Sequence, residues 1–128
     1  MKKIELRTAS RRQMVTITAE VQAAVRELGV VDGSCHVYVP HTTAAVVINE
    51  NADPDVARDL LAAYEEMVPK IRFAHAEGNS DAHLMATVLG SSVTVLVENG
   101  RLQLGTWQGI FFVELDGPRS RKVWVGSG

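Results

Sequence analysis

The segment from Ile110 to Leu115 constrains the fold more than any other part of this sequence. It reads Ile-Phe-Phe-Val-Glu-Leu, with apolar side chains at both alternating sets of positions. A strand whose two faces are both apolar is covered on both sides, which is typical of the middle of a sheet. We therefore expect residues 110–115 to form a central strand.

The surrounding sequence predicts further antiparallel strands. Apolar residues alternate over 93–97, and Asn99-Gly100 is the dipeptide that tight β-hairpin turns prefer. Residues 102–104 would form the returning strand. After the turn at 116–118, a last strand runs through 123–125.

The first two thirds of the chain alternate strands with helices. Strands are expected over residues 3–8, 14–17, 35–39 and 44–48, where apolar residues alternate or cluster. Thr18 can cap a helix that presents Val21, Ala24, Val25 and Leu28 and ends at Gly29. The sequence therefore predicts one α+β domain over residues 1–128, with helices packed on a mixed or antiparallel sheet or sandwich.

Two more helices are expected in the middle of the chain. Asp53-Pro54 is a strong helix start, and the buried stripe of that helix would be Val56, Leu60, Leu61, Tyr64 and Val68. A shorter helix is expected from about Asp81 to Leu89, with Ser80 or Asp81 as its N-cap.

Composition excludes several classes of protein. The chain of 128 residues has a formal net charge of −2 and only 5% aromatic residues, so it offers no general affinity for nucleic acid or for anionic membranes. No apolar run reaches the roughly 18 residues that a membrane helix needs. The N-terminus shows no secretory signal and the single Cys35 cannot form an internal disulfide, so we expect a cytoplasmic protein.

The most polar segment is His75 to Leu84, which contains two imidazoles, two carboxylates, an amide and a hydroxyl. It leads into the short helix, whose first N–H groups would lie beside His83. A helix N-terminus favours anions and lowers the pKa of a nearby imidazole. The alternative is an ordinary polar surface loop before a capped helix, and the segment alone does not separate the two.

Other polar groups also lie at the ends of predicted elements, where functional residues concentrate. His41 follows a strand, whereas His36 lies inside an apolar alternation and is expected to be structural. His41, His75 and His83 are candidate ligands for a divalent metal, with zinc or another transition ion favoured over magnesium. Acid–base chemistry is the alternative for the same imidazoles.

Arg119 and Arg121 flank Ser120 and would share one face of a strand, which suits phosphate or carboxylate. Gatekeeper charges on a solvated edge strand explain the same spacing. A tryptophan such as Trp107 is more often a core or interface residue than a platform for a ligand, but its position between Gly105 and Gly109, next to Gln108, favours a functional role.

Four segments together resemble the signatures of the YjbQ family. They are His41–Ala45 with Ile48–Glu50 and Asp53–Val56, His75–Leu84, Gly100–Gln108, and Glu114–Arg121. They cover nearly the whole chain in the family's order, and every polar position of the signatures is matched.

The resemblance implies a compact α+β domain that assembles as a homotrimer. It also implies a weak secondary thiamine-phosphate synthase activity, which joins a hydroxymethylpyrimidine diphosphate to a thiazole phosphate and releases pyrophosphate. A non-catalytic trimeric module that binds a metal ion or a phosphorylated metabolite is the alternative function.

The residues are compatible with that chemistry. Leaving pyrophosphate needs its charge stabilised, by arginines, by a helix N-terminus or by magnesium carried with the diphosphate. His83 is then the candidate acid, and Asp81 or Glu50 would orient an imidazole. The candidate groups for binding the phosphorylated substrate are Arg119, Arg121, Asn79, Thr106, Trp107 and Gln108.

Overall fold

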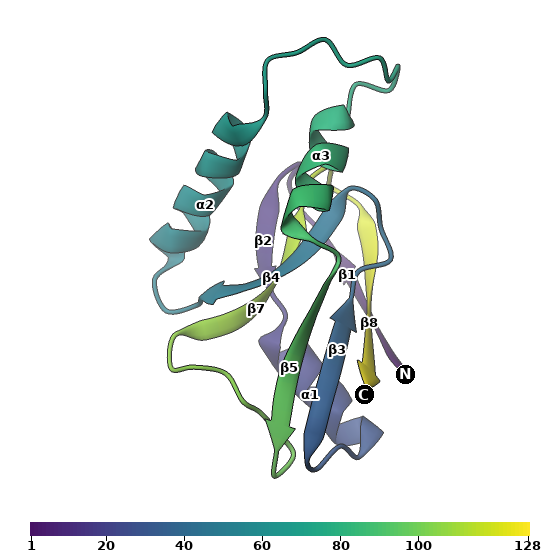
Figure 1. The fold of residues 1–128 in the computed structure, drawn as a ribbon, viewed down its shortest axis with the longest axis vertical. Helices are drawn as coiled ribbons and strands as arrows, with labels where there is room; N and C mark the ends of the chain where they lie inside the picture. Colours follow the sequence, from purple (N-terminus) through teal and green to yellow (C-terminus); the bar gives the residue numbers. More distant parts are fainter.

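The computed structural model describes all 128 residues, and its strands form two antiparallel sheets (Figure 1). The larger sheet has the order β1 (Lys2–Arg7), β8 (Ser120–Ser127), β3 (Gly33–Tyr38), β5 (Ser92–Glu98) and β6 (Arg101–Leu102). The smaller sheet has the order β2 (Gln13–Thr16), β7 (Gln108–Glu114) and β4 (Ala44–Glu50). The predicted central strand is therefore β7, the middle strand of the smaller sheet.

Three helices complete the single α+β domain: α1 (Thr18–Leu28), α2 (Pro54–Met67) and α3 (Ser80–Leu89). The order of helices and strands agrees with the sequence prediction. No helix is both long enough and apolar enough to cross a membrane.

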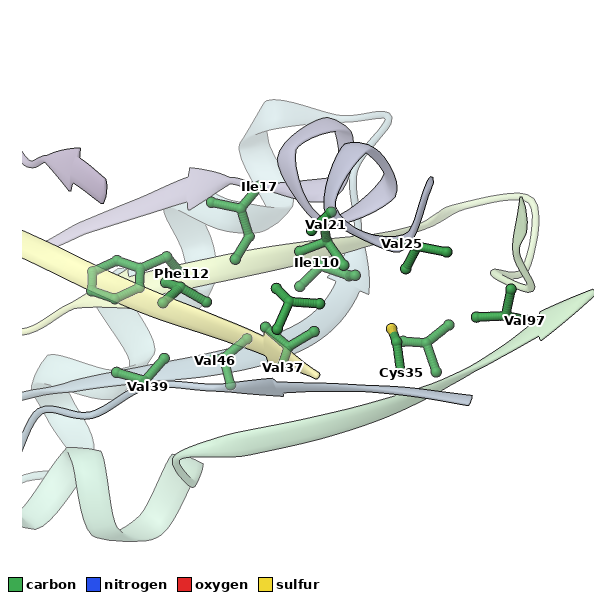
Figure 2. Packing of buried hydrophobic residues seen from close by; sticks show 14 of the residues in the cluster. Ile17, Val21, Val25, Cys35, Val37, Val39, Val46, Val97, Ile110 and Phe112 are labelled. Atoms are coloured by element: carbon green, nitrogen blue, oxygen red, sulfur yellow. The ribbon is translucent and has the colours of Figure 1, made fainter. Parts of the chain in front are cut away.

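The main hydrophobic core lies between the two sheets and under α1 (Figure 2). Phe112 of β7 and Val46 of β4 meet Val37 of β3, and α1 contributes Val21 and Val25. The opposite face of the smaller sheet forms a second cluster with α3, in which Ala45 and Val113 pack near Ala82, Met85, Ala86 and Leu115. Both faces of β7 are covered, which explains its apolar residues at consecutive positions.

Local signals set most element ends correctly. Gly29 ends α1 with a φ of 71°, and Asn99 and Gly100 both adopt positive φ in the predicted hairpin turn. The Asp53 carboxylate accepts a hydrogen bond of 2.9 Å from the Asp55 N–H at the start of α2.

The other two N-caps were predicted at the wrong residues. Ile17 caps α1, because the Thr18 hydroxyl instead accepts a hydrogen bond of 2.9 Å from the Ile110 N–H of β7. Asn79, rather than Ser80 or Asp81, caps α3 and makes no side-chain capping bond there. A tertiary contact outweighs the local capping preference of Thr18.

The apolar stripe predicted for α2 is less buried than expected. No residue of α2 is buried, and Leu61, Tyr64 and Val68 are only partly covered where they pack against the second cluster. Figure 1 shows α2 standing at the side of the smaller sheet, joined to α3 by a long connection. Within one chain, this helix has too few neighbours to cover its apolar face.

Gly117 lies where two loops approach closely. A Cβ atom at this position would lie 2.4 Å from the Ser10 carbonyl oxygen and 2.7 Å from Cγ of Glu114. We predict that Gly117→Ala lowers the free energy of unfolding by about 1–3 kcal/mol through overpacking. Gly126→Ala is the matched control, because a Cβ there meets nothing within 4 Å. Equal urea midpoints for the two variants would contradict this prediction.

Candidate functional site

An open cleft of about 750 Å³ lies where β3 ends and β8 begins. The segment between β3 and β4 and the segment that leads into α3 form its other walls. Its lining is mainly polar and includes His41, His75, His83, Asn79, Arg119 and Arg121. Six of the candidate site residues therefore lie together, although they come from three separate segments of the chain.

A buried ion pair underlies the cleft. Arg121 of β8 points inward and pairs with Glu114 of β7, so the pair joins the larger sheet to the smaller one. The Arg121 Nε–H donates to Glu114 Oε1 at 2.8 Å, and a second bond joins Arg121 Nη2 to Glu114 Oε2. The side chains of Arg121 and Glu114 are 5% and 0% exposed, so water does not compensate either charge.

Residues in the loops around the cleft make further hydrogen bonds to Glu114 and Arg121. Glu114 accepts bonds from the Thr8 hydroxyl at 2.7 Å and from the Leu115 and Asp116 N–H groups at 3.0 and 3.1 Å. Arg121 Nη2 donates to the carbonyl and hydroxyl oxygens of Thr43. Burial alone would raise the pKa of Glu114, but the bonds from Arg121 and Thr8 outweigh it and lower the pKa.

Arg121 is therefore mainly a structural residue of the site. Its Nε and Nη2 groups already donate to Glu114 and Thr43, and the guanidinium charge is neutralised before any ligand binds. The prediction that Arg119 and Arg121 share one face of a strand does not fit this arrangement, because Arg119 precedes β8 and Arg121 is paired with the buried Glu114.

Arg119 has the better geometry for an anion. It lies just before β8, is about half exposed, and uses Nε and Nη2 to contact the Asp116 carbonyl and carboxylate at 2.7 and 2.9 Å. Its Nη1 group donates to no protein atom. The Asp116 carboxylate also accepts a bond of 2.9 Å from Asn79, so it holds the arginine beside the N-cap of α3.

Asp116 remains charged in this arrangement. Its burial would raise its pKa, but hydrogen bonds from Asn79 and Arg119 lower the pKa below its usual value. A negative Asp116 fixes the orientation of the Arg119 guanidinium through Nε and Nη2, so Nη1 keeps its hydrogen-bonding capacity, and Arg119 lines the cleft.

His41 is held in one tautomer by the backbone. Its Nε2 atom accepts a hydrogen bond of 2.9 Å from the Lys122 N–H of β8, so in the neutral ring the proton is on Nδ1. Burial lowers the pKa of His41, and the charge of Arg121 lowers it further. The neutral imidazole therefore keeps Nδ1–H as its donor, and His41 lines the cleft.

His75 and His83 form a second pair of rings in the cleft. Their centroids are 5.5 Å apart in an edge-to-face arrangement, and Glu77 lies 4.0 Å from Nε2 of His75. His36 lies elsewhere on β3, where its Nδ1 contacts the Thr94 hydroxyl at 3.0 Å. The predicted convergence of His41, His75 and His83, with His36 apart, agrees with the structure.

The three histidines do not form a ready metal site. No group of three or more His, Cys, Asp or Glu side chains could hold an ion. Nε2 of His41, its only lone pair in the neutral form, already accepts the Lys122 N–H. The predicted three-histidine metal site therefore does not fit this geometry, and acid–base or hydrogen-bonding roles fit these imidazoles better.

Four predicted site residues lie away from the cleft within one chain. Glu50 is at the far end of β4, where it pairs in register with Gln108 at the start of β7. Trp107 is 64% exposed, and its carbonyl accepts the Asn51 N–H at this same end. Since β7 runs from Gln108 to Glu114, Thr106, Trp107 and Gln108 lie about 20 Å from the cleft end of that strand.

Asp81, in the first turn of α3, pairs with arginines of another loop. It forms ion pairs with Arg11 at 3.0 Å and with Arg12, both in the turn between β1 and β2. It does not line the cleft and does not contact an imidazole. The prediction that Asp81 or Glu50 orients a histidine was therefore wrong, because distant charges in the fold hold Asp81 and β4 carries Glu50 away.

The aromatic rings of Tyr38 and Trp124 also line the cleft, with centroids 5.9 Å apart. Sequence reasoning did not find them. It also assigned no role to Glu114 or Thr43. A signal for Glu114 existed, because it is the only charged residue in the apolar run 110–115 and needed a buried cationic partner.

Comparison with known proteins identifies the family. The family model "UPF0047 protein YjbQ-like" matches residues 2–127. The chain belongs to the YjbQ family. It is 47% identical over 127 residues to UPF0047 protein YugU of Bacillus subtilis, covering 98% of this chain and 96% of that protein.

Two solved structures have the same fold as this chain. A protein from Clostridium acetobutylicum is 50% identical and superposes with a TM-score of 0.96 over 100% of both chains. A conserved hypothetical protein from Thermus thermophilus is 42% identical, with a TM-score of 0.91 and the same full coverage. The Clostridium protein is described as uncharacterised, so these likenesses establish the family and the fold.

His41 provides a test of the site's electrostatics. We predict that its imidazole titrates below the usual 6.5 and carries its neutral-state proton on Nδ1. As the pH falls, the His41 imidazole is therefore protonated at a higher pH in the unfolded chain than in the folded protein. The stability that neutral His41 contributes is complete above about pH 6.5 and is lost as the pH falls toward the folded pKa.

Imidazole NMR reports both quantities for this residue. A titration midpoint above 6.5 would contradict the lowering of the pKa by burial and by Arg121. A neutral ring with its proton on Nε2 would contradict the hydrogen bond from the Lys122 N–H to His41.

Proposed function

We propose that this YjbQ family member joins two phosphorylated heteroaromatic compounds and releases pyrophosphate, as a thiamine-phosphate synthase does. The ring nitrogen of a thiazole phosphate attacks the methylene carbon of a hydroxymethylpyrimidine diphosphate. The new C–N bond uses the nitrogen lone pair, and the C–O bond breaks with its electrons on the diphosphate. No oxidant, reductant or proton acceptor is required.

One combination of groups carries this proposal. The same cleft contains the free edge of Arg119, three imidazoles and the rings of Tyr38 and Trp124. Arginine and imidazole suit phosphate oxygens, whereas aromatic rings suit a planar heterocycle. A cleft of about 750 Å³ is also large enough for two small substrates.

The departing diphosphate is the group that most needs assistance. As the C–O bond breaks, negative charge increases on the leaving oxygen, and a fixed donor beside it lowers the barrier. Arg119 Nη1 is such a donor, since Asp116 already holds the rest of its guanidinium. The N-terminal turn of α3 starts at the neighbouring Asn79 and adds its partial positive charge.

The histidines would assist in two ways. The Nδ1–H of His41 donates a hydrogen bond without bringing a full charge, because its pKa is lowered by burial and by Arg121. His83 is the candidate acid for the departing pyrophosphate, because it lies in the first turns of α3 beside His75.

A second candidate function is a binding module for a phosphorylated metabolite, without catalysis. The openness of the cleft to solvent favours this candidate, because a dedicated transferase normally excludes water from the reacting atoms. Such a site would show incidental synthase activity through charge stabilisation alone.

Kinetics with the two thiamine precursors distinguish these functions. We predict that wild type forms thiamine phosphate and that Arg119→Ala lowers kcat/KM by at least about 100-fold, the scale expected for loss of one electrostatic donor. The matched control Arg101→Ala, on β6 and outside the cleft, keeps the wild-type value. A wild-type kcat/KM well below about 10⁴ M⁻¹ s⁻¹ would favour the binding module.

We also propose that the protein assembles as a closed homotrimer. The apolar side of α2 is half covered, and Met67 and Ile71 are each more than half exposed. Apolar surface of this kind is commonly covered by another subunit, and homo-oligomers usually close by cyclic symmetry. Light scattering should give about three times the chain mass of 13.9 kDa, and a monomer mass would refute the trimer.

A further inference from the structure

A second pocket of about 410 Å³ adjoins the cleft. The two cavities share three residues, His41, Thr42 and His83. Two imidazoles therefore stand at the boundary between the cavities. A ligand that lies across this boundary would place one end in each cavity and its central atoms beside the histidines.

The two cavities differ in chemistry. Apart from the shared histidines, the second pocket has no acidic or basic side chain, and its own lining consists of Ala44, Ala86, Thr87, Gly90 and Ser91. The alanines are buried and supply apolar contact, whereas the hydroxyl groups supply hydrogen bonds. The cleft, by contrast, contains Arg119, whose Nη1 group donates to no protein atom. A phosphate group is therefore favoured in the cleft and not in the second pocket.

Helix α3 runs from one cavity to the other and reinforces this difference. Asn79, its N-cap, lines the cleft, and Gly90, its C-cap, lines the second pocket. The ten residues of the helix separate the two ends by about 15 Å. The N-terminal end carries partial positive charge, and the C-terminal end carries partial negative charge on its last carbonyl groups. The second pocket therefore favours a group that donates hydrogen bonds, such as an aromatic amine.

We propose that the second pocket binds the amino-bearing heteroaromatic ring of the diphosphate substrate, an assignment that rests on the proposed function. The diphosphate of the same molecule then lies in the cleft by Arg119 and Asn79. The methylene carbon between ring and diphosphate lies at the boundary, where the C–O bond to the diphosphate breaks and the C–N bond forms. The attacking ring then approaches the methylene carbon from the side of Tyr38 and Trp124.

Two small probes test this assignment separately from the reaction. In wild type, 4-aminopyrimidine should shift the NMR signals of Thr87, Gly90 and Ser91, and inorganic pyrophosphate should shift those of Asn79 and Arg119. Thr87→Trp fills the rim of the second pocket and should raise the Kd for 4-aminopyrimidine by about tenfold or more, with the Kd for pyrophosphate changed less than about twofold.

Val88→Trp is the matched control, because Val88 is the exposed neighbour of Thr87 on α3 and lines neither cavity. It should leave both Kd values unchanged. If Thr87→Trp does not fold, Ser91→Trp on the same rim replaces it.

Three results would overturn the assignment: no binding of 4-aminopyrimidine to wild type, shifts at Tyr38 and Trp124 in place of Thr87, or an unchanged Kd in the rim variant. Binding of 4-aminopyrimidine in the second pocket without any binding of pyrophosphate would support the ring pocket and contradict the proposed transferase instead.

Discussion

The structure depends on the buried pair between Arg121 and Glu114. Each residue belongs to a different sheet, and no water is available to replace a lost partner. Removing one member of such a pair costs about 3–5 kcal/mol, although the intact pair adds little to stability over an apolar replacement. The main effect of the pair in this fold is to hold other groups in position. Through Thr8, Thr43 and the peptide groups after β7, the pair fixes the loops that form the cleft.

The functional groups follow from this constraint in a short series of contacts. Glu114 holds the Asp116 N–H, the Asp116 carboxylate holds Arg119 and Asn79, and Asn79 begins α3. Helix α3 then brings His83 to the boundary between the cleft and the second pocket. The buried charge of Glu114 thus determines the orientation of Arg119 at the surface. The dipole of α3 gives the cleft partial positive charge and the second pocket partial negative charge.

Much of the fold could be predicted from local sequence. The two-sided apolar pattern of β7, the Asn99-Gly100 turn and the Asp53-Pro54 helix start each specify their structure within a few residues. The grouping of His41, His75 and His83 also followed from their places at element ends. What failed depended on distant contacts: Thr18 bonds to Ile110, Asp81 pairs with Arg11 and Arg12, and Glu50 and Trp107 lie at the opposite end of the smaller sheet. The order of strands in the two sheets decides these positions, and it cannot be predicted from the spacing of residues in the sequence.

Native-state amide hydrogen exchange on the wild-type protein tests most directly whether the buried pair fixes the cleft loops. The amides of Leu115, Asp116 and Arg119 lie outside β7 and β8, yet each donates to Glu114 or to Thr8, whose hydroxyl bonds to Glu114. If the pair joins these loops to the core, the three amides should exchange only through global unfolding, with the same opening free energy as Phe112 in β7. Exchange of these amides through a local opening, while Phe112 stays protected, would contradict that account.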